Sequence, residues 1–249
     1  MAIIQARMGS TRLPGKVLKD LAGEPMLTRV VHRVCRANML DDVVIATTTA
    51  SADGVIAELC HRHGWPCFRG SEDDVLDRYY QAAMTYRADV LVRITSDCPL
   101  IDPDVVDKVV QAFIDRQPQV DYVCNVLFPR GLDTEVMRFD VLERAWRKDR
   151  NPVWREHVTP YIYYNPNLFQ IHLMINEMDL SHMRWTLDTP EDLTFMRQIY
   201  DYFGHDHFSW GDVLALLGQN PQWLKLNRHV KQKNLRRHKG EESGGEKCV

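Results

Sequence analysis

Short apolar runs alternate along this chain with longer stretches in which apolar residues recur every three or four positions. The first pattern is typical of buried strands and the second of amphipathic helices, and their alternation indicates βαβ units around a largely parallel sheet. In the first half of the chain, strands are predicted over 2–5, 43–47 and 89–95, and helices over 26–38, 53–63, 75–86 and 103–116.

The pattern is less regular between about 121 and 176, where strand-like and helical pieces are short. Strands are predicted there near 134–138 and 168–175, and helices near 140–149 and 155–164. A strand followed by a helix returns over 183–203. We expect one domain over 1–228, with 121–176 as an insert, and a flexible charged tail over 229–249.

Size and charge exclude several classes of protein. A chain of 249 residues with 45% hydrophobic side chains can bury a substantial core. The net charge of −3 argues against a general nucleic-acid binder, and no apolar run approaches the ~20 residues that span a bilayer. The start of the chain lacks a charged segment followed by an apolar segment and a cleavage site, so the cytoplasm is the expected location.

One group of metal-ligating residue types was considered as a zinc site. Cys60, His61, His63 and Cys67 lie within eight positions. Their spacing matches no common zinc finger, and Cys60 falls on the apolar stripe of a predicted helix. A structural role for these residues is therefore favoured over zinc binding.

The opening stretch "AIIQARMGSTRLPGKVL", residues 2–18, resembles a phosphate-binding loop without matching the Walker A pattern. Gly9 and Gly15 enclose five residues instead of four, and Lys16 is followed by Val17 where Walker A requires Ser or Thr. The chain is therefore not expected to be a P-loop NTPase.

The chemistry of the loop still favours a polyphosphate. The loop follows a strand, at the sheet edge where open α/β proteins bind ligands. Its glycines allow close approach of the backbone, and its cations and hydroxyls offer bonds to phosphate oxygens. The residues concerned are Arg7, Gly9, Ser10, Thr11, Arg12 and Lys16. The alternative is a mobile basic surface loop.

The sequence R-x-T-x-D occurs twice, as "RITSD" (93–97) and "RWTLD" (184–188), each predicted to close a strand. Each copy is followed by a predicted helix start, Asp102-Pro103-Asp104 and Thr189-Pro190-Glu191-Asp192, which cap and first-turn preferences explain. Asp97 and Asp188 precede these caps, so capping does not explain them. Carboxylates from two strand ends beside a phosphate loop are the expected oxygen ligands of Mg²⁺. The alternative is that each pairs only with a nearby arginine or backbone amide.

Several segments together resemble the cytidylyltransferase-like family that includes spore-coat polysaccharide biosynthesis protein F, with a more distant relation to CMP-KDO and CMP-sialic acid synthetases. The resemblance rests on "QARMGSTRLPGKVL", "SEDDVLDRYYQAA", "VRITSDCPLIDPDVVD", "GLDTEV", "REHVTPYIYYN" and "RWTLDTPEDL", in order over about residues 2–200. It implies an α/β, three-layer, nucleotide-diphosphosugar-transferase-like fold of the GT-A/Rossmann-like kind. It also implies NMP transfer from an NTP, with CTP expected, onto a sugar or sugar acid for surface polysaccharide synthesis.

The resemblance also implies roles for individual residues. Asp97 and Asp188 match the family's metal-binding aspartates, so Mg²⁺ is the expected cofactor. Arg12 and Lys16 would hold the β- and γ-phosphates and take part in catalysis with the two aspartates. Arg78 would lie near the nucleotide, and the alternative for it is a salt bridge to Asp74 on the same helix face. The insert would bind the sugar or form a homodimer. By residue type, the candidate substrate ligands in it are Arg130, Asp133, Glu135, Arg155 and His157, and the alternative is that they form surface ion pairs or an interface between subunits.

Two other functions remain open at this stage. A glycosyltransferase of the same fold would hold metal through a D-x-D motif, and Asp102-Pro103-Asp104 is formally one, although it also suits a helix cap. A scaffold could bind nucleotide without turnover, because fold alone does not establish function.

Overall fold

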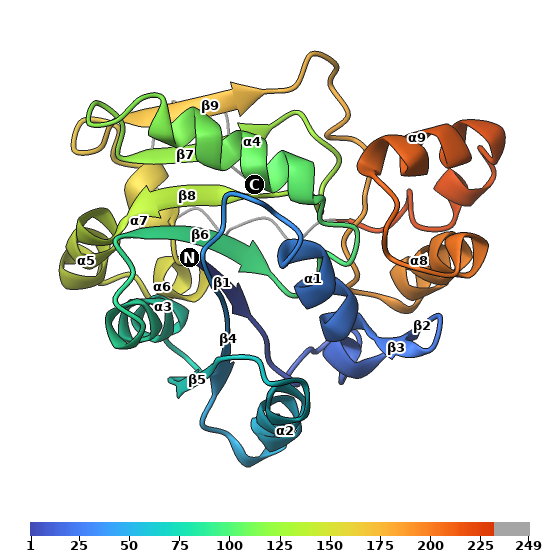
Figure 1. Ribbon diagram of the computed structural model, residues 1–249, viewed down its shortest axis with the longest axis horizontal. Coiled ribbons are helices and arrows are strands. Elements are labelled where there is room, and N and C mark those ends of the chain that lie inside the picture. Colours follow the sequence, from blue (N-terminus) through green and yellow to red (C-terminus); the bar gives the residue numbers. More distant parts are fainter. Residues whose placement is uncertain (232–249) are drawn as a thin grey trace.

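The computed structural model describes residues 1–231, and its centre is a seven-stranded sheet with the order β5-β4-β1-β6-β8-β7-β9. Only β8 runs against the others, and in Figure 1 its arrowhead points opposite to those of β6 and β9. The sheet contains β1 (Ala2–Gln5), β4 (Val43–Thr48), β5 (Cys67–Gly70), β6 (Val90–Thr95), β7 (Tyr122–Val126), β8 (Glu135–Arg138) and β9 (Ile171–Ile175). A separate small sheet pairs β2 (Asp20–Leu21) with β3 (Glu24–Pro25).

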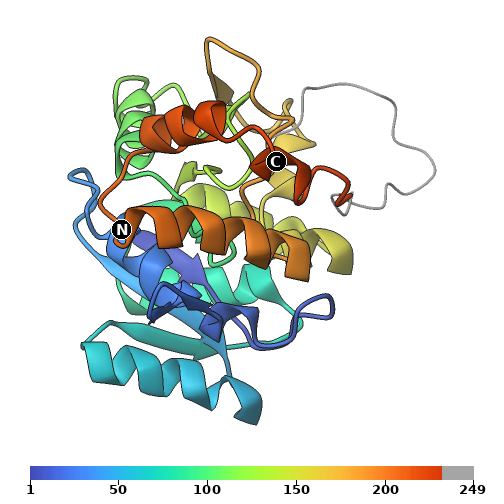
Figure 2. The same cartoon turned by 90° about the vertical axis from the view of Figure 1, so that its right-hand side faces the viewer.

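Helices cover both faces of the large sheet. They are α1 (Met26–Val34), α2 (Gly54–His63), α3 (Val75–Thr85), α4 (Pro103–Ile114), α5 (Phe139–Lys148), α6 (Pro152–His157), α7 (Pro160–Tyr163), α8 (Pro190–Phe203) and α9 (Trp210–Gln219). Short 3₁₀ turns occur at Lys16–Leu18, Ser51–Asp53 and Trp223–Lys225. Figure 1 shows α1 and α4 in front of the sheet, and Figure 2 shows α8 and α9 along the side of the molecule.

Strand alternation explains why the chain forms three layers. In β1, Ile4 belongs to the core under α1 and α4, whereas Ile3 belongs to the core under α3 and α5. Both side chains are completely buried, as expected for a central strand covered on two faces. The predicted α/β, three-layer fold with a mostly parallel sheet is confirmed.

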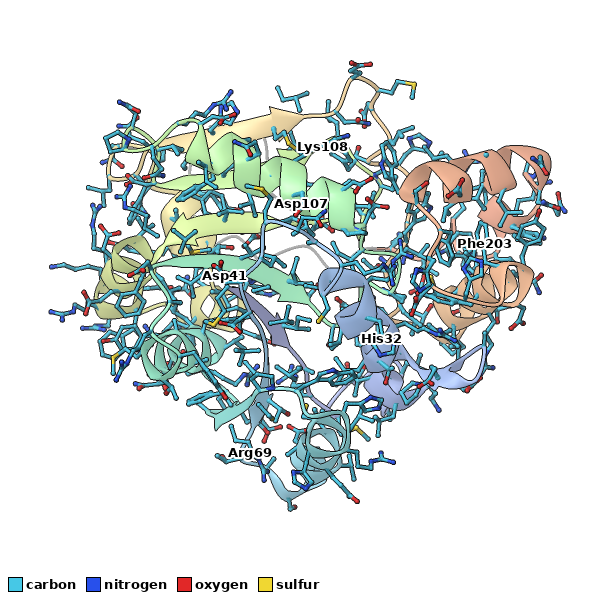
Figure 3. The ribbon with its side chains drawn as sticks, in the orientation of Figure 1. His32, Asp41, Arg69, Asp107, Lys108 and Phe203 are labelled. Atoms are coloured by element: carbon cyan, nitrogen blue, oxygen red, sulfur yellow. The ribbon has the colours of Figure 1, made fainter. Side chains whose placement is uncertain are left out.

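Side-chain hydrogen bonds outside the sheet join α4 to the segment that follows α1. Asp107 on α4 accepts hydrogen bonds from the backbone N–H groups of Asn38 and Met39, at 2.9 and 2.8 Å, just beyond the end of α1 (Figure 3). The helix predicted over 26–38 ends at Val34. The two oxygens of Asp107 accept hydrogen bonds from backbone N–H groups in the segment that follows the helix.

The prediction of a strand over 184–188 is wrong. This segment is extended but makes a single bridge, between Arg130 and Arg184, and crosses the sheet edge instead of joining the sheet. Its backbone hydrogen bonds are with loop residues. Trp185 N–H donates to the backbone carbonyl of Arg130 at 2.7 Å, and Leu187 N–H donates to the backbone carbonyl of Asp97 at 2.8 Å.

The single helix predicted over 155–164 is also wrong. The chain forms α6 and α7, separated at Val158, whose φ is +73°. Here Thr159 N–H donates to the His157 carbonyl at 2.9 Å, which closes a γ-turn that β-branched residues rarely adopt. The strands β2, β3, β5 and β7 and the helix α9 were not predicted.

Candidate functional site

A cavity of about 400 Å³ opens at the edge of the sheet where β1 and β6 end and β8 begins. Segments far apart in the sequence line it, from Gln5 to Asp188. Among them are the predicted site residues Arg7, Gly9, Ser10, Thr11, Arg12, Lys16, Arg78, Asp97, Arg130, Asp133, Glu135, His157 and Asp188.

Buried Asp53 fixes the start of the loop that follows β1. One of its oxygens accepts a hydrogen bond from Met8 N–H at 2.6 Å, and the other accepts one from the hydroxyl of Thr48. Further along, Ser10 Oγ accepts from Leu13 N–H at 3.3 Å. These bonds anchor the start of the loop to Asp53 and stabilise a turn within it.

Lys16 joins the two predicted metal ligands. Its Nζ lies 2.9 Å from Asp97 Oδ2 and 2.7 Å from Asp188 Oδ1. Burial alone would raise the pKa of Asp97, but Lys16 holds it well below its ordinary value. Burial would likewise lower the pKa of Lys16, and the two carboxylates raise it instead. Lys16 and Asp97 are therefore both charged at neutral pH.

Asp188 is held by a second set of contacts behind it. Its Oδ2 accepts from Arg12 at 2.9 Å and from Arg184 at 2.8 Å. Arg184 is itself fixed by Asp192, which is fully buried and also closes the capping box of α8 with Thr189. The helix-cap interpretation of Thr189 and Asp192 is confirmed, and the cap also positions the site.

A buried ion pair also lines the cavity. Arg93 on β6 lies 3.0 Å from Glu135 on β8, because these two residues are paired in the sheet register. Thr159 Oγ1 donates to the same Glu135 oxygen at 3.3 Å. The second oxygen, Oε2, is buried and has no partner among residues 1–231.

Asp133 and His157 line the cavity near this ion pair. Burial raises the pKa of Asp133, whose carboxylate also accepts from Gly131 N–H at 2.8 Å. Burial lowers the pKa of His157, so its ring is neutral at neutral pH. The γ-turn at Val158 lies directly after His157.

Arginines also line the sides of the cavity. Arg78 is almost completely buried and donates to the Ser71 carbonyl at 2.5 Å, and not to Asp74 as the alternative interpretation had it. Arg7 lies 3.4 Å from Glu156 near the cavity entrance. Arg130 makes no side-chain hydrogen bond or ion pair with residues 1–231 and is available to a ligand.

Two sequence candidates lie outside the cavity lining. Arg155 donates to Asp74 at 2.7 Å and to the carbonyls of Trp146 and Asp149, so it joins α3, α5 and α6. Asp102, the first residue of the D-x-D triplet, caps α4 and is 1% exposed. The triplet therefore has the cap role and not a metal-binding geometry.

The sequence interpretation missed several lining residues. Gln5, Arg93 and Glu156 face the cavity beside the predicted groups. Arg93 carried a usable signal, because it alternates with Thr95 at the end of a strand. Glu156 carried none, because its position depends on the turn after α6.

The two carboxylates fit a divalent cation that is shared with a ligand. Asp97 and Asp188 direct one oxygen each at a single point, now taken by Lys16 Nζ. Residues 1–231 contain no group of three or more His, Cys, Asp or Glu side chains arranged to hold a metal, and that includes the residues around Cys60. Mg²⁺ binds commonly through one or two carboxylates together with substrate phosphates.

Comparison with known proteins gives the family. A family model described as "Cytidylyltransferase" matches residues 1–237. The chain is a member of the cytidylyltransferase family. The spore coat polysaccharide biosynthesis protein SpsF of Bacillus subtilis is 35% identical over 227 residues, covering 88% of this chain and 94% of that protein.

Two further relatives agree with this assignment. A cytidylyltransferase structure from Leptospira borgpetersenii is 34% identical, covers 94% of this chain and 98% of that one, and superposes with a TM-score of 0.87. A 3-deoxy-manno-octulosonate cytidylyltransferase of Trichlorobacter lovleyi is 38% identical over 116 residues, which is 46% of this chain and 44% of that protein. The predicted cytidylyltransferase family is therefore confirmed. The prediction that the chain is a nucleotidyltransferase is confirmed as well.

Other expectations keep the status of predictions. The tail lies outside the described residues from 232 onward, and the homodimer and the role of 121–176 are untested. Strands β7, β8 and β9 from that segment belong to the main sheet. Within residues 1–231, no helix has both the length and the apolar character needed to cross a bilayer.

Proposed function

We propose that this cytoplasmic enzyme is a Mg²⁺-dependent cytidylyltransferase that transfers CMP from CTP to a sugar or sugar acid, releases pyrophosphate and serves surface polysaccharide synthesis. The observation that carries the proposal is the meeting of Lys16 with Asp97 and Asp188 in a cavity at the carboxyl edge of the sheet. The names of the relatives support the donor, the acceptor class and the pathway.

The nucleotide would lie along the loop after β1. Arg12 and Lys16 would bind the β- and γ-phosphates and stabilise the departing pyrophosphate. Arg7, Gly9, Ser10, Thr11 and Arg78 would position the base, the ribose or the α-phosphate. Six cationic side chains and five carboxylates line the cavity, so the protein alone does not neutralise a triphosphate. This balance supports a requirement for a divalent cation.

The metal would be held by Asp97 and Asp188 together with phosphate oxygens. When bound, it would neutralise phosphate charge and lower the pKa of a coordinated hydroxyl. The chain itself would align the attacking sugar hydroxyl with the α-phosphate, because phosphoryl-group transfer depends mainly on positioning and charge stabilisation.

The sugar would occupy the end of the cavity formed by Arg130, Asp133, Glu135 and His157. Neutral His157 and the unpartnered oxygen of Glu135 offer acceptors for sugar hydroxyls. Arg130 offers a cation for an acidic group of the sugar. These two features support a polyhydroxylated acceptor, including a sugar acid.

The first experiment measures pyrophosphate release with Mg²⁺ and each of the four NTPs. A panel of sugars that includes 2-keto sugar acids is tested with wild type, Asp97→Asn and Asp104→Asn. We expect release with CTP, a loss of at least 100-fold in Asp97→Asn, and unchanged release in Asp104→Asn, whose side chain is exposed on α4. Asp104→Asn is the matched control for removal of one carboxylate.

The outcomes separate the candidate functions. Transfer from a nucleotide sugar without pyrophosphate release would favour the glycosyltransferase. CTP binding with no release for any sugar in the panel would favour a scaffold. Absence of both binding and release would contradict the nucleotide role of the loop.

A further inference from the structure

Lys16 occupies the point at which the two carboxylates converge. Its Nζ contacts one oxygen of Asp97 and one of Asp188, at 2.9 and 2.7 Å, and only 12% of its side chain is exposed. A cation coordinated by these two carboxylates would use the same oxygens. Lys16 and a metal ion therefore compete for one place.

The surroundings of Asp188 strengthen this competition. Its second oxygen already accepts from Arg12 and Arg184, so three cationic side chains face two carboxylates. A divalent ion entering this group without a nucleotide would displace Lys16 and lie close to two guanidinium groups. Because like charges repel at short range in a partly buried site, this exchange is unfavourable.

The three cations differ in how firmly they are held. Arg184 binds both oxygens of buried Asp192, at 2.9 Å each, and is fixed from behind the cavity. Arg12 and Lys16 come from the loop after β1, and within residues 1–231 their ion pairs are with Asp97 and Asp188 alone. A triphosphate offers both of them stronger anionic partners, whereas Arg184 would remain in place.

We propose that Lys16 is an internal counter-ion that keeps the metal site closed until the nucleotide binds. The inference rests on the proposed function, and it adds an order to the binding events. The triphosphate draws Lys16 and Arg12 from the carboxylates, which then accept the divalent ion. Nucleotide and metal binding are thereby coupled, and by linkage each raises the affinity for the other.

The test measures Mn²⁺ binding without nucleotide, by electron paramagnetic resonance of the free ion. Wild type, Lys16→Gln, Arg12→Gln and the double variant Lys16→Gln/Asp97→Asn are titrated. We expect Lys16→Gln to bind Mn²⁺ at least tenfold more tightly than wild type, and the double variant to lose this gain. Arg12→Gln should gain less than threefold, because Lys16 still bridges both carboxylates in that variant.

Three results would overturn the proposal. They are equal Mn²⁺ affinity in wild type and Lys16→Gln, an equal gain in Arg12→Gln, or a gain that survives in the double variant. None of them affects pyrophosphate release by wild type, so failure of the proposed function is recognised separately. Conversely, a wild type that releases no pyrophosphate leaves the comparison of Mn²⁺ affinities readable.

A measurement on the wild type covers the case in which Lys16→Gln does not fold. The NMR signal of the Lys16 side chain is followed in protein with isotope-labelled lysine, and Lys16→Arg identifies the signal by its absence. We expect the signal to shift with metal-free CTP and to stay unchanged with Mg²⁺ alone at millimolar concentration. A shift with Mg²⁺ alone would overturn the proposal.

Discussion

Glu135 shows how sheet register produces a binding group. Antiparallel pairing places it opposite Arg93, and burial leaves the side chain 2% exposed. Burial alone would lower the pKa of Arg93, but Glu135 outweighs it and raises that pKa, so Arg93 stays charged. Because an unpaired buried carboxylate oxygen is costly, Oε2 of Glu135 is best explained by a ligand that donates to it.

Replacing Glu135 with Gln tests this explanation. The variant keeps the shape of the side chain but removes its charge, and a hydrogen bond to a charged group contributes about 1.5–3 kcal/mol. We expect the KM for the sugar to rise about tenfold or more, while the affinity for CTP changes less than twofold. Steady-state kinetics with varied sugar and calorimetric titration with CTP measure the two quantities.

Thr159→Val is the matched control for Glu135→Gln. It removes the 3.3 Å hydroxyl bond to the other oxygen of Glu135 and leaves the carboxylate in place. We expect a change in sugar KM of less than threefold. An unchanged sugar KM in Glu135→Gln would show that Glu135 stabilises the sheet and does not contact the acceptor.

The sequence predicted the chemistry of the site better than its contacts. The cations of the loop and the two aspartates could be identified by residue type and by their place after strands. That Lys16 would bridge Asp97 and Asp188 could not, because the three residues are far apart in sequence and meet only in the folded sheet. The contacts of Arg155 could not be predicted for the same reason, since its partner Asp74 caps a different helix, α3.

At the scale of elements, a close crossing positions the segment 184–188. Gly131 has a φ of +107°, and a Cβ built on it would lie 2.4 Å from the carbonyl oxygen of Trp185. The missing side chain lets the loop after β7 bond to this segment, through Arg130 and Trp185. The crossing therefore determines where Asp188 points.

Gly131→Ala should disrupt this crossing. The added methyl group meets backbone atoms that cannot rotate away, and alanine is also strained at this φ. We expect a loss of about 2–4 kcal/mol in the free energy of unfolding, measured by urea denaturation, together with weakened CTP binding.

Gly204→Ala provides the comparison for Gly131→Ala. Gly204 ends α8 with a φ of +68°, and a Cβ there would meet nothing within 4 Å. We expect this variant to lower the free energy of unfolding by about 1 kcal/mol and to leave CTP binding unchanged. Equal losses in the two variants would mean that only backbone strain matters and that the crossing with Trp185 does not.

Periodicity predicted long elements well and short ones poorly. Helices with clear caps, such as α4 and α8, begin at the predicted prolines. The helix predicted over 155–164 failed because the break at Val158 has no local sequence signal, such as glycine, at that position. The strand predicted over 184–188 failed because an extended segment becomes a strand only if a neighbouring strand pairs with it.

At the scale of the whole molecule, Asp206 connects the end of α8 to α1. Its carboxylate lies 2.9 Å from Arg36 and 3.4 Å from both Arg29 and His32, and the residue is 5% exposed. Figure 3 labels His32 on α1 and Phe203 on α8, the two helices that meet at this junction. Burial would raise the pKa of Asp206, but Arg36 and its neighbours lower it.

The lowered pKa gives a stability that depends on pH with a defined sign. The Asp206 carboxylate stabilises the fold above the unfolded-state pKa near 4, and this contribution is lost as the pH falls through the lower folded-state pKa. We expect Asp206→Asn to lower the free energy of unfolding by about 2–4 kcal/mol at pH 7. The difference from wild type should be smaller below about pH 4. Urea denaturation at a series of pH values measures both.

Asp201→Asn is the control for this prediction, because Asp201 is exposed on α8. We expect a change within about 0.5 kcal/mol at every pH. If the loss in Asp206→Asn stayed constant down to pH 3, the charge of Asp206 would not be the stabilising factor.

The topology of the sheet shows where the sequence interpretation reached its limit. Alternating strands and helices predicted a mostly parallel sheet, which is correct for six of its seven strands. That β8 lies between β6 and β7 in the opposite direction could not be predicted, because strand order depends on packing between distant segments. The reversal matters for the site, since it brings the beginning of β8, and not its end, to the cavity.

The span of the Lys16–Asp188 contact, 172 positions along the chain, has a consequence for how the enzyme matures. During synthesis, the loop after β1 is made early, and its last partner, Asp188, is added only after most of the chain. A nascent or truncated chain that ends before Asp188 already contains every strand of the large sheet, because β9 ends at Ile175. It still lacks the second carboxylate of the site and the core residues of α8, so catalytic activity would report completed folding more strictly than the presence of strands does.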